Sequence, residues 1–241
     1  MEKITSFNFE AGRILANKYE VIQSIGKGWE GEVYLLREKN TKIERAAKFF
    51  FPHQNKNNKS LVRYAKKLHK LRHCSMVIQY LSQETIWFRK QPINFLVSEF
   101  VEGELLSDFM KRQKGKHLDP YTALHLLYAL VQGMEEIHQL REYHGDLHTE
   151  NIIVERFGLE FHLKLVDMYH WDQSYSRPEN IKDDVCDMVR LFYEALGGAK
   201  YYSKQPGVIK EICCGLKKTL ILKKFKSAKR LKNFIEALQW E

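Results

Sequence analysis

The first hundred residues contain short stretches in which apolar and polar positions alternate. Three of them, residues 19–25, 32–37 and 45–51, are rich in β-branched and aromatic residues and are separated by glycines or polar turns. Two more follow around residues 77–88 and 93–101. Alternation of this kind is typical of strands that bury one face. The pattern therefore predicts a sheet in this part of the chain.

One segment within this region has a helical period instead. From residue 60 to residue 71, apolar side chains recur every three or four positions, and lysines and arginines fill the places between them. The apolar positions are Leu61, Tyr64, Ala65, Leu68 and Leu71. This spacing places them on one face of a helix. A single amphipathic helix is thus expected among the strands.

After Gly103 helical periods dominate. The pair Asp119-Pro120 predicts a helix start, because an Asp side chain caps free amide groups and a proline loses nothing at the first helical position. That helix is expected to run to about residue 140. Further helices are expected over residues 184–196, 208–220 and 227–238.

The order of these elements predicts an α+β fold with two lobes. A small strand-rich lobe with one helix comes first, a larger and mainly helical lobe follows, and residues 99–103 form the expected hinge.

Composition is ordinary for a globular domain. The chain has 241 residues, 44% of them hydrophobic, which is enough for a sizeable core. No apolar run approaches the roughly 20 residues of a membrane helix, and residues 1–17 lack an apolar signal core. We therefore expect no membrane span and a protein that is cytoplasmic or is exported by a route without a signal peptide. The four cysteines show neither metal-site spacing nor disulfide density and are expected to be reduced.

The formal net charge of +9 is compatible with acidic proteins, nucleic acid or anionic lipid as partners. Much of the excess lies in residues 59–72 and 217–232, where solvated helix faces are expected. The basic stretches contain no groove-reading motif and few interleaved aromatic residues, which disfavours nucleic acid.

The clearest candidate chemistry lies in the sequence HGDLHTEN, from His144 to Asn151. An apolar run and a short hairpin follow, and the hairpin leads to Asp167. Asp146 can accept a proton from an attacking hydroxyl, while the Asn151 and Asp167 oxygens can hold Mg²⁺ against nucleotide phosphates. These spacings predict a phosphoryl-transfer site.

A glycine-rich segment, GKGWEGEV from Gly26 to Val33, lies between two predicted strands. Glycines let a backbone fold closely over phosphates. Because a strand rather than a helix follows, the segment differs from the dinucleotide-binding fingerprint. The third strand carries Lys48 after two alanines.

In these motifs and their order the chain resembles the protein kinase superfamily, and the resemblance covers most of its length. It implies an N-terminal extension (residues 1–17), an N-lobe with a small antiparallel sheet (18–101) and a mainly helical C-lobe (102–241). It also implies ATP as cofactor with Mg²⁺, or Mn²⁺ as an alternative, and a protein substrate.

The resemblance implies a role for each candidate residue. Asp146 would be the base, Lys48 would hold the α- and β-phosphates, His148 would contact the transferring phosphate, and Asn151 and Asp167 would bind metal. Ser98 would be the gatekeeper beside the nucleotide pocket. The remaining nucleotide contacts would come from Gly26, Lys27, Gly28, Gly31, Val33, Ala46, Glu99, Val101 and Ile153.

The sequence also departs from the family pattern. No Asp or Glu occurs from residue 45 to residue 83, and Tyr64 falls where the helix Glu that pairs with the lysine is expected. Either Glu30, Glu32 or Glu84 reaches Lys48, or the phosphate contact is weaker.

The catalytic loop and the segment after it depart as well. Gly145 and His148 give the loop an H-G-D-x-H form, and Asp167-Met168-Tyr169 replaces D-F-G. Only a short activation segment fits before Arg177-Pro178-Glu179, which resembles a compressed A-P-E. A site set without loop phosphorylation is therefore expected.

Three functions remain open at this point. The first is a Mg²⁺-dependent Ser/Thr protein kinase, favoured by the retained Asp146, Asn151 and Asp167. The second is a pseudokinase that binds nucleotide and a partner, favoured by the missing helix acid. The third is a small-molecule phosphotransferase of the aminoglycoside or choline type, favoured by the H-G-D-x-H loop. The sequence does not predict the substrate or the oligomeric state.

Overall fold

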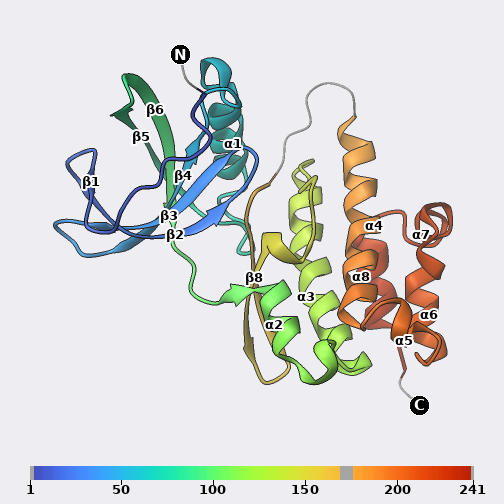
Figure 1. The fold of residues 1–241 in the computed structure, drawn as a ribbon. Coiled ribbons are helices and arrows are strands. Elements are labelled where there is room, and N and C mark those ends of the chain that lie inside the picture. Colours follow the sequence, from blue (N-terminus) through green and yellow to red (C-terminus); the bar gives the residue numbers. More distant parts are fainter. Residues whose placement is uncertain (1–2, 169–175, 240–241) are drawn as a thin grey trace. The chain divides into compact units, whose positions relative to one another are not determined.

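The computed structural model describes residues 3–168 and 176–239. Within it the chain divides into two units (Figure 1). The N-terminal unit comprises residues 1–73 and 78–101, and the C-terminal unit comprises residues 74–77 and 102–241. The expected two-lobed fold, with an antiparallel sheet first and a helical part after it, is confirmed.

The N-terminal unit is built on a six-stranded antiparallel sheet in the order β1-β2-β3-β4-β6-β5. The strands are β1 Ile14–Leu15, β2 Tyr19–Lys27, β3 Gly31–Glu38, β4 Glu44–Phe50, β5 Tyr80–Phe88 and β6 Gln91–Glu99. The alternating stretches of the sequence correspond to β2 to β6. The fourth begins at Tyr80 rather than at Val77, because Val77 instead pairs with Leu165 of the C-terminal unit.

The predicted amphipathic helix is α1, Lys59–Lys70, preceded by a short 3₁₀ turn, Lys56–Asn58. Leu61, Tyr64 and Leu68 are buried on one face, as the apolar spacing requires. The Asn55 side chain accepts a hydrogen bond from the Leu61 amide at 3.2 Å, which satisfies one of the free amide groups at the start of the helix.

The start of the chain also belongs to the core of this unit. Ile4, Phe7 and Phe9 are buried, and the Phe7 ring stacks on Phe51 at 5.4 Å between centroids. Aromatic pairs in this geometry add to the stabilisation from burial alone. Residues 1–17, expected to be an extension, thus pack into the sheet from residue 4 onward and supply β1.

A buried carboxylate fastens this N-terminal segment. Glu32 accepts hydrogen bonds from the Ser6 hydroxyl at 2.6 Å, the Phe7 amide at 3.0 Å and the Tyr34 hydroxyl at 2.7 Å. Burial opposes ionisation of Glu32, but these hydrogen bonds outweigh it and lower its pKa. Burial and the contact with Glu32 raise the pKa of Tyr34 to about 12.

The C-terminal unit is mainly helical and contains a three-stranded sheet in the order β7-β8-β9. Its strands are β7 Glu104–Leu105, β8 Ile152–Phe157 and β9 Glu160–Leu165. Its helices are α2 Leu106–Arg112, α3 Pro120–Gln139, α4 Arg177–Ala195, α5 Ala199–Tyr202, α6 Gly207–Cys213, α7 Lys218–Lys224 and α8 Ala228–Glu236.

Helix α3 begins and ends as predicted. The Asp119 side chain accepts from the Thr122 amide at 3.0 Å, and Pro120 is the first helical residue. Gly133 lets α3 approach Met76, because a Cβ at this position would lie 2.3 Å from the Met76 Cε. The Met76 carbonyl in turn accepts from the Leu165 amide at 2.7 Å, so this glycine helps to place the end of β9.

Two helix predictions were wrong. Helix α4 begins at Arg177, not at residue 184, because Ser176 and Glu179 form a capping box in which Glu179 accepts from the Ser176 amide at 3.0 Å. The helix expected over residues 208–220 is two helices, α6 and α7. The chain turns between them at Cys214, Gly215 and Leu216, whose φ angles are positive.

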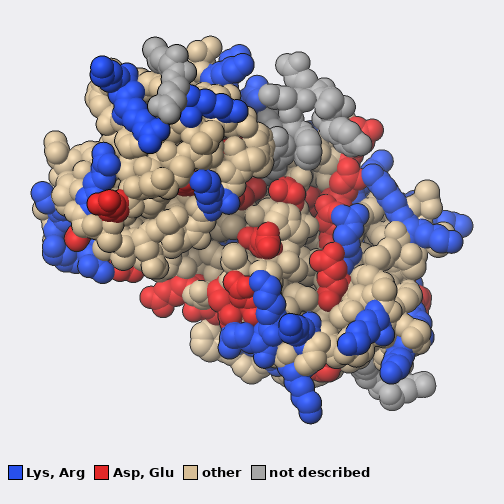
Figure 2. Space-filling view, in the orientation of Figure 1, with Lys and Arg blue, Asp and Glu red and all other residues tan. Residues whose placement is uncertain are grey.

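All four cysteines are free thiols, and three of them are buried. Over residues 3–168 and 176–239, no helix has both the length and the apolar character to cross a membrane. On the face shown in Figure 2, Lys and Arg side chains lie in several separate places, while Asp and Glu side chains gather on the C-terminal unit. The positive charge is therefore spread over this face rather than concentrated in one basic patch.

Candidate active site

The catalytic loop, residues 144–151, is held by a buried carboxylate on α4. Asp184 is fully buried and accepts from the amides of His144 at 2.8 Å and Gly145 at 3.0 Å. His138 on α3 places its Nε2 3.0 Å from the same carboxylate. Because each of these groups is tied to the core, the loop has a fixed conformation. Gly145 has φ +85°, a value that favours glycine over the Arg expected from the family.

Three predicted site residues meet in this loop. The Asn151 amide nitrogen donates to the Asp146 carbonyl at 2.8 Å and lies 3.0 Å from His148 Nε2. His148 Nε2 lies 3.6 Å from the Asp146 carboxylate. The Asp146 side chain is 56% exposed, whereas Asn151 is buried. The accessible Asp146 carboxylate thus lies beside the fixed Asn151 amide. This arrangement suits a proton acceptor next to a metal ligand.

The donor atoms here fit Mg²⁺. Among the described residues, the Asn151 side chain forms its hydrogen bonds through its nitrogen, so its Oδ1 can serve as a ligand atom. The Val166 amide donates to the Asn151 carbonyl at 3.0 Å, so Asp167 follows a residue bonded directly to Asn151. Amide and carboxylate oxygens are the ligands that Mg²⁺ takes, with nucleotide phosphates completing its shell. Among the described residues, no cluster of three or more His, Cys, Asp or Glu side chains that could hold a metal occurs.

Asp167 itself adopts φ +53°, which non-glycine residues rarely do. Such conformations concentrate at functional sites, where the surrounding structure holds them. Tyr169 and residues 170–175 lie outside the described residues, so the expectations about the D-F-G position and the length of the activation segment remain predictions.

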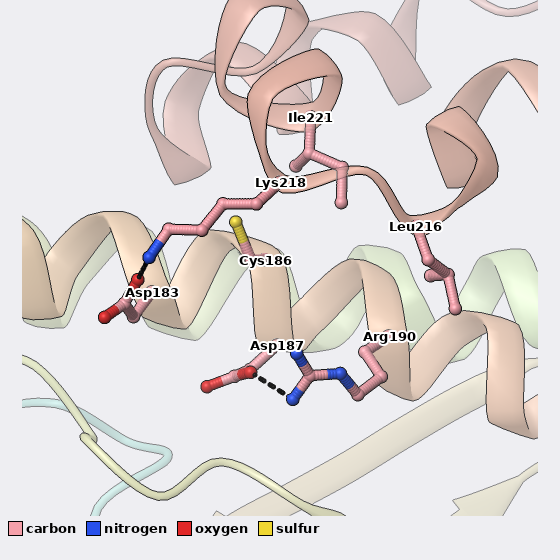
Figure 3. A pocket seen from close by; sticks show the side chains of 7 residues that line it. All are labelled: Asp183, Cys186, Asp187, Arg190, Leu216, Lys218 and Ile221. Carbon is pink, nitrogen blue, oxygen red and sulfur yellow. Dashed lines mark hydrogen bonds and ion pairs between the residues drawn. The ribbon is translucent and has the colours of Figure 1, made fainter.

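A small pocket of the C-terminal unit lies between α4 and the chain around α7 (Figure 3). It contains two ion pairs, Asp183 with Lys218 and Asp187 with Arg190, the second at 2.9 Å. Burial raises the pKa of Asp187 to about 6, and the negative charges of Asp184 and Asp146 contribute to the rise. Asp187 therefore binds its proton more tightly than an ordinary aspartate.

The N-terminal unit carries the residues predicted to bind nucleotide. Gly26, Lys27 and Gly28 lie at the end of β2 and in the turn after it, and Gly31 begins β3. A Cβ at Gly31 would lie 1.9 Å from the Phe49 carbonyl oxygen, so the close approach of β3 to β4 demands this glycine.

At Gly28 a Cβ would meet nothing within 4 Å. Packing therefore does not explain this glycine, whereas an approaching phosphate would, so the loop fits ATP. The predicted contact Lys27 forms an ion pair with Glu32 at 3.1 Å.

Lys48 on β4 is paired with Glu30, one of the three acids considered for it. The Lys48 ammonium lies 2.9 Å from the Glu30 carboxylate, and the two side chains are 11% and 21% exposed. Of the other two candidates, Glu32 holds the N-terminal segment, and Glu84 lies 3.6 Å from Lys18. Tyr64 presents its ring 5.2 Å from the Lys48 ammonium.

The expected adenine-side residues are distributed over both units. Val33, Ala46 and Glu99 lie on β3, β4 and β6, and Val101 ends the N-terminal unit. Ser98 is buried, pairs with Ala46 across the sheet and donates weakly to its carbonyl at 3.4 Å. Ile153 is half-buried on β8 of the C-terminal unit.

Sequence reasoning missed the residues that hold the site. The resemblance placed Asp184 at the start of the helix that anchors the catalytic loop in the family, but the sequence did not show that its side chain itself binds the loop amides. Nothing in the sequence pointed to His138 or to the Ser6 contact with Glu32.

One unit carries a glycine-rich hairpin and a strand lysine, and the other carries a loop with a carboxylate and an amide, in the chain order expected of a protein kinase domain. The chain belongs to the protein kinase domain family, whose model matches residues 19–204.

The relatives agree with this assignment. An Aurora kinase of Patiria pectinifera is 28% identical over 73% of this chain and 42% of its own length. A probable serine/threonine-protein kinase of Clostridium perfringens is 31% identical over 61% of this chain and 21% of its own length. For the serine/threonine-protein kinase PrkC of Bacillus subtilis, the identity is 26% and the shares are 61% and 22%. The chain thus spans less than half the length of these curated relatives.

Among solved structures, the kinase domain of Mycobacterium tuberculosis PknI aligns with a TM-score of 0.66 at 17% identity. The alignment covers 95% of this chain and 98% of that domain. At this identity the likeness establishes the fold.

Proposed function

We propose that this domain is an ATP- and Mg²⁺-dependent protein kinase that transfers the γ-phosphate to a Ser or Thr hydroxyl. The observation that carries the proposal is the pairing of an exposed Asp146 with a buried Asn151, whose amide nitrogen is tied to the Asp146 carbonyl. Relatives named as serine/threonine-protein kinases support the choice of acceptor.

In this proposal each group has one task. Asp146 orients the acceptor hydroxyl and takes its proton, because its carboxylate is the accessible base of the loop. Asn151 Oδ1 and Asp167 hold Mg²⁺, which supplies neutralisation of phosphate charge when it is bound with ATP. Lys48 holds the α- and β-phosphates under the glycine-rich loop. Phosphoryl transfer depends on positioned charge more than on covalent chemistry, so these groups suffice.

His148 has a supporting task. Its ring lies against the Asn151 amide and near the Asp146 carboxylate, so it helps to fix both side chains. The proposal also gives His148 a contact with the transferring phosphate. The remaining nucleotide contacts are proposed as predicted. Gly26, Lys27, Gly28 and Gly31 would cover the phosphates, the backbone around Glu99 and Val101 would bind the adenine edge, and Val33, Ala46 and Ile153 would surround the ring.

The test is transfer of label from γ-labelled ATP, with Mg²⁺ and then Mn²⁺, to the protein itself and to a mixed protein substrate. Asp146→Asn should lose labelling by about 10²- to 10⁴-fold, the usual contribution of a positioned base. The matched control is Asp108→Asn, which removes an exposed acid paired with Lys111 in the same unit. Acid hydrolysis then identifies the labelled amino acid.

Labelled Ser or Thr that disappears only in Asp146→Asn would support the proposal. Bound ATP without transfer to any acceptor would instead indicate a pseudokinase. Label found only on a small hydroxyl compound would indicate a small-molecule phosphotransferase.

A further inference from the structure

The positive charge of Lys48 lies in a largely buried environment. With its side chain 11% exposed, the ammonium has lost most of its water, and an unpaired charge in such a place is strongly unfavourable. Helix α1 contains no Asp or Glu. The rings of Tyr64 and Phe50 lie 5.2 and 5.4 Å from the ammonium and offer their faces to it, but rings do not replace a carboxylate.

The glycine-rich loop brings a carboxylate to Lys48. Glu30 contacts Lys48 at 2.9 Å, and its own main chain is anchored to the end of β4 by a hydrogen bond from the Phe51 amide to its carbonyl at 2.8 Å. The next residue, Gly31, allows the loop to come this close, since any Cβ there would collide with the Phe49 carbonyl. The loop therefore carries Glu30 to a fixed place beside Lys48.

We propose that Glu30 is the positioning residue for Lys48, acting from the glycine-rich loop in the place of an acid on α1. The inference rests on the proposed use of Lys48 as a phosphate ligand. Held between Glu30 and the Tyr64 ring, the ammonium keeps one orientation before nucleotide arrives. Because Glu30 belongs to the loop that covers the phosphates, the position of the loop and the position of the ammonium are coupled.

Three proteins test the proposal, each compared with wild type. Glu30→Gln keeps the shape of the side chain and removes its charge. Glu44→Gln is the matched control, since it removes one acid from β4 that is paired with Arg37 at 3.0 Å and lies apart from Lys48. The double variant Glu30→Gln/Tyr64→Glu moves the acid from the loop to α1. Each is measured for the Kd of Mg²⁺-ADP by calorimetry, for kcat and KM of ATP, and for its unfolding midpoint.

We expect Glu30→Gln to weaken ADP binding and to lower kcat/KM by about 10- to 100-fold, the usual effect of losing a hydrogen bond between charged groups. Its unfolding midpoint should stay close to that of Glu44→Gln. The double variant should regain most of the lost affinity and activity. A residue that only shapes the loop would not be replaced by an acid on another element, so this recovery identifies positioning.

Two results would overturn the proposal. If Glu30→Gln binds ADP and turns over like Glu44→Gln, Glu30 has no part in positioning. If it binds ADP more tightly than wild type, Glu30 competes with phosphates for Lys48 rather than orienting it. ADP binding separates this question from the proposed function. Lost and regained affinity in a protein that transfers no phosphate would sustain the role of Glu30 and refute the kinase activity alone.

Discussion

The candidate residues of the two units are held in place by different means. In the C-terminal unit, the catalytic loop is held by Asp184, a fully buried carboxylate that accepts hydrogen bonds from two loop amides and contacts His138. In the N-terminal unit, Lys48 forms an ion pair with Glu30, a partly exposed acid at the tip of a hairpin. The catalytic loop is therefore tied to the core of its unit, whereas the contact of Lys48 with Glu30 can be altered by moving one loop.

The largest effect should come from Asp184→Ala. Removing this acceptor breaks the hydrogen bonds from the buried His144 amide and the half-buried Gly145 amide, and we expect the free energy of unfolding to fall by about 3 to 5 kcal/mol. Denaturant unfolding of the purified domain measures the change. Asp183→Ala is the control, because its side chain is 32% exposed and lies one residue earlier on α4. Equal losses in the two variants would show that the buried carboxylate does not hold the loop.

In the N-terminal unit, the first residues of the chain hydrogen-bond to Glu32 and so stabilise the glycine-rich hairpin. Ser6→Ala removes a hydrogen bond to the buried Glu32 carboxylate and should lower the free energy of unfolding by about 1.5 to 3 kcal/mol. Thr5→Ala, at an exposed position next to it, should change little. Thermal unfolding of both variants measures this difference in stability. A Ser6→Ala protein as stable as Thr5→Ala would mean that the N-terminal segment is fastened by its apolar side chains alone.

Two glycines of the same hairpin should behave in opposite ways. Gly31→Ala forces a methyl group against the Phe49 carbonyl and should lower the free energy of unfolding by about 1 to 3 kcal/mol. Gly28→Ala has open space, so its stability should stay within about 0.5 kcal/mol of wild type while its affinity for Mg²⁺-ADP falls. Unfolding and calorimetry are measured on both. Unchanged ADP binding in Gly28→Ala would count against phosphate contact at this position.

The smallest effect concerns pH. Burial raises the pKa of Asp187 from its ordinary 3.8 to about 6, opposed by Arg190 and assisted by Asp184, Asp183 and Asp146. Between these pH values the native protein keeps a proton that the unfolded chain has released, so the free energy of unfolding falls as the pH rises from about 4 to about 6. In Asp187→Asn, the free energy of unfolding should fall by about 1 kcal/mol less over this pH range than in wild type. This value allows for the partial exposure of the side chain.

Urea unfolding of wild type and Asp187→Asn between about pH 4 and pH 7 measures the difference. Parallel curves for the two proteins would show that Asp187 does not titrate differently in the folded state.

Most of the fold could be predicted because periodicity reports which face is buried. Strands β2 to β6 and helices α1, α3 and α8 follow from alternating or helical spacing of apolar residues. The N-terminal segment could not be found this way, since Ile4, Phe7 and Phe9 match neither period. The break between α6 and α7 was hidden because two of its residues with positive φ, Cys214 and Leu216, are not glycines.

The catalytic loop was located by spacing alone, since its residues are close in sequence and keep that closeness in space. The partner of Lys48 was not decided by the sequence, which left Glu30, Glu32 and Glu84 open. The choice depends on how near the hairpin comes to β4 at Gly31, and such a distance between strands is a tertiary property.

Residues 74–77 belong to the C-terminal unit although the chain before and after them builds the N-terminal one. The backbone therefore passes between the units at three places rather than at one. Met76 and Val77 are buried, and the Met76 carbonyl accepts a hydrogen bond from the Leu165 amide. A cut near residue 101 would therefore not yield two complete modules. The helical fragment would lack a piece of its own core, and the other fragment would carry that piece exposed, so each unit is a part of one folding whole.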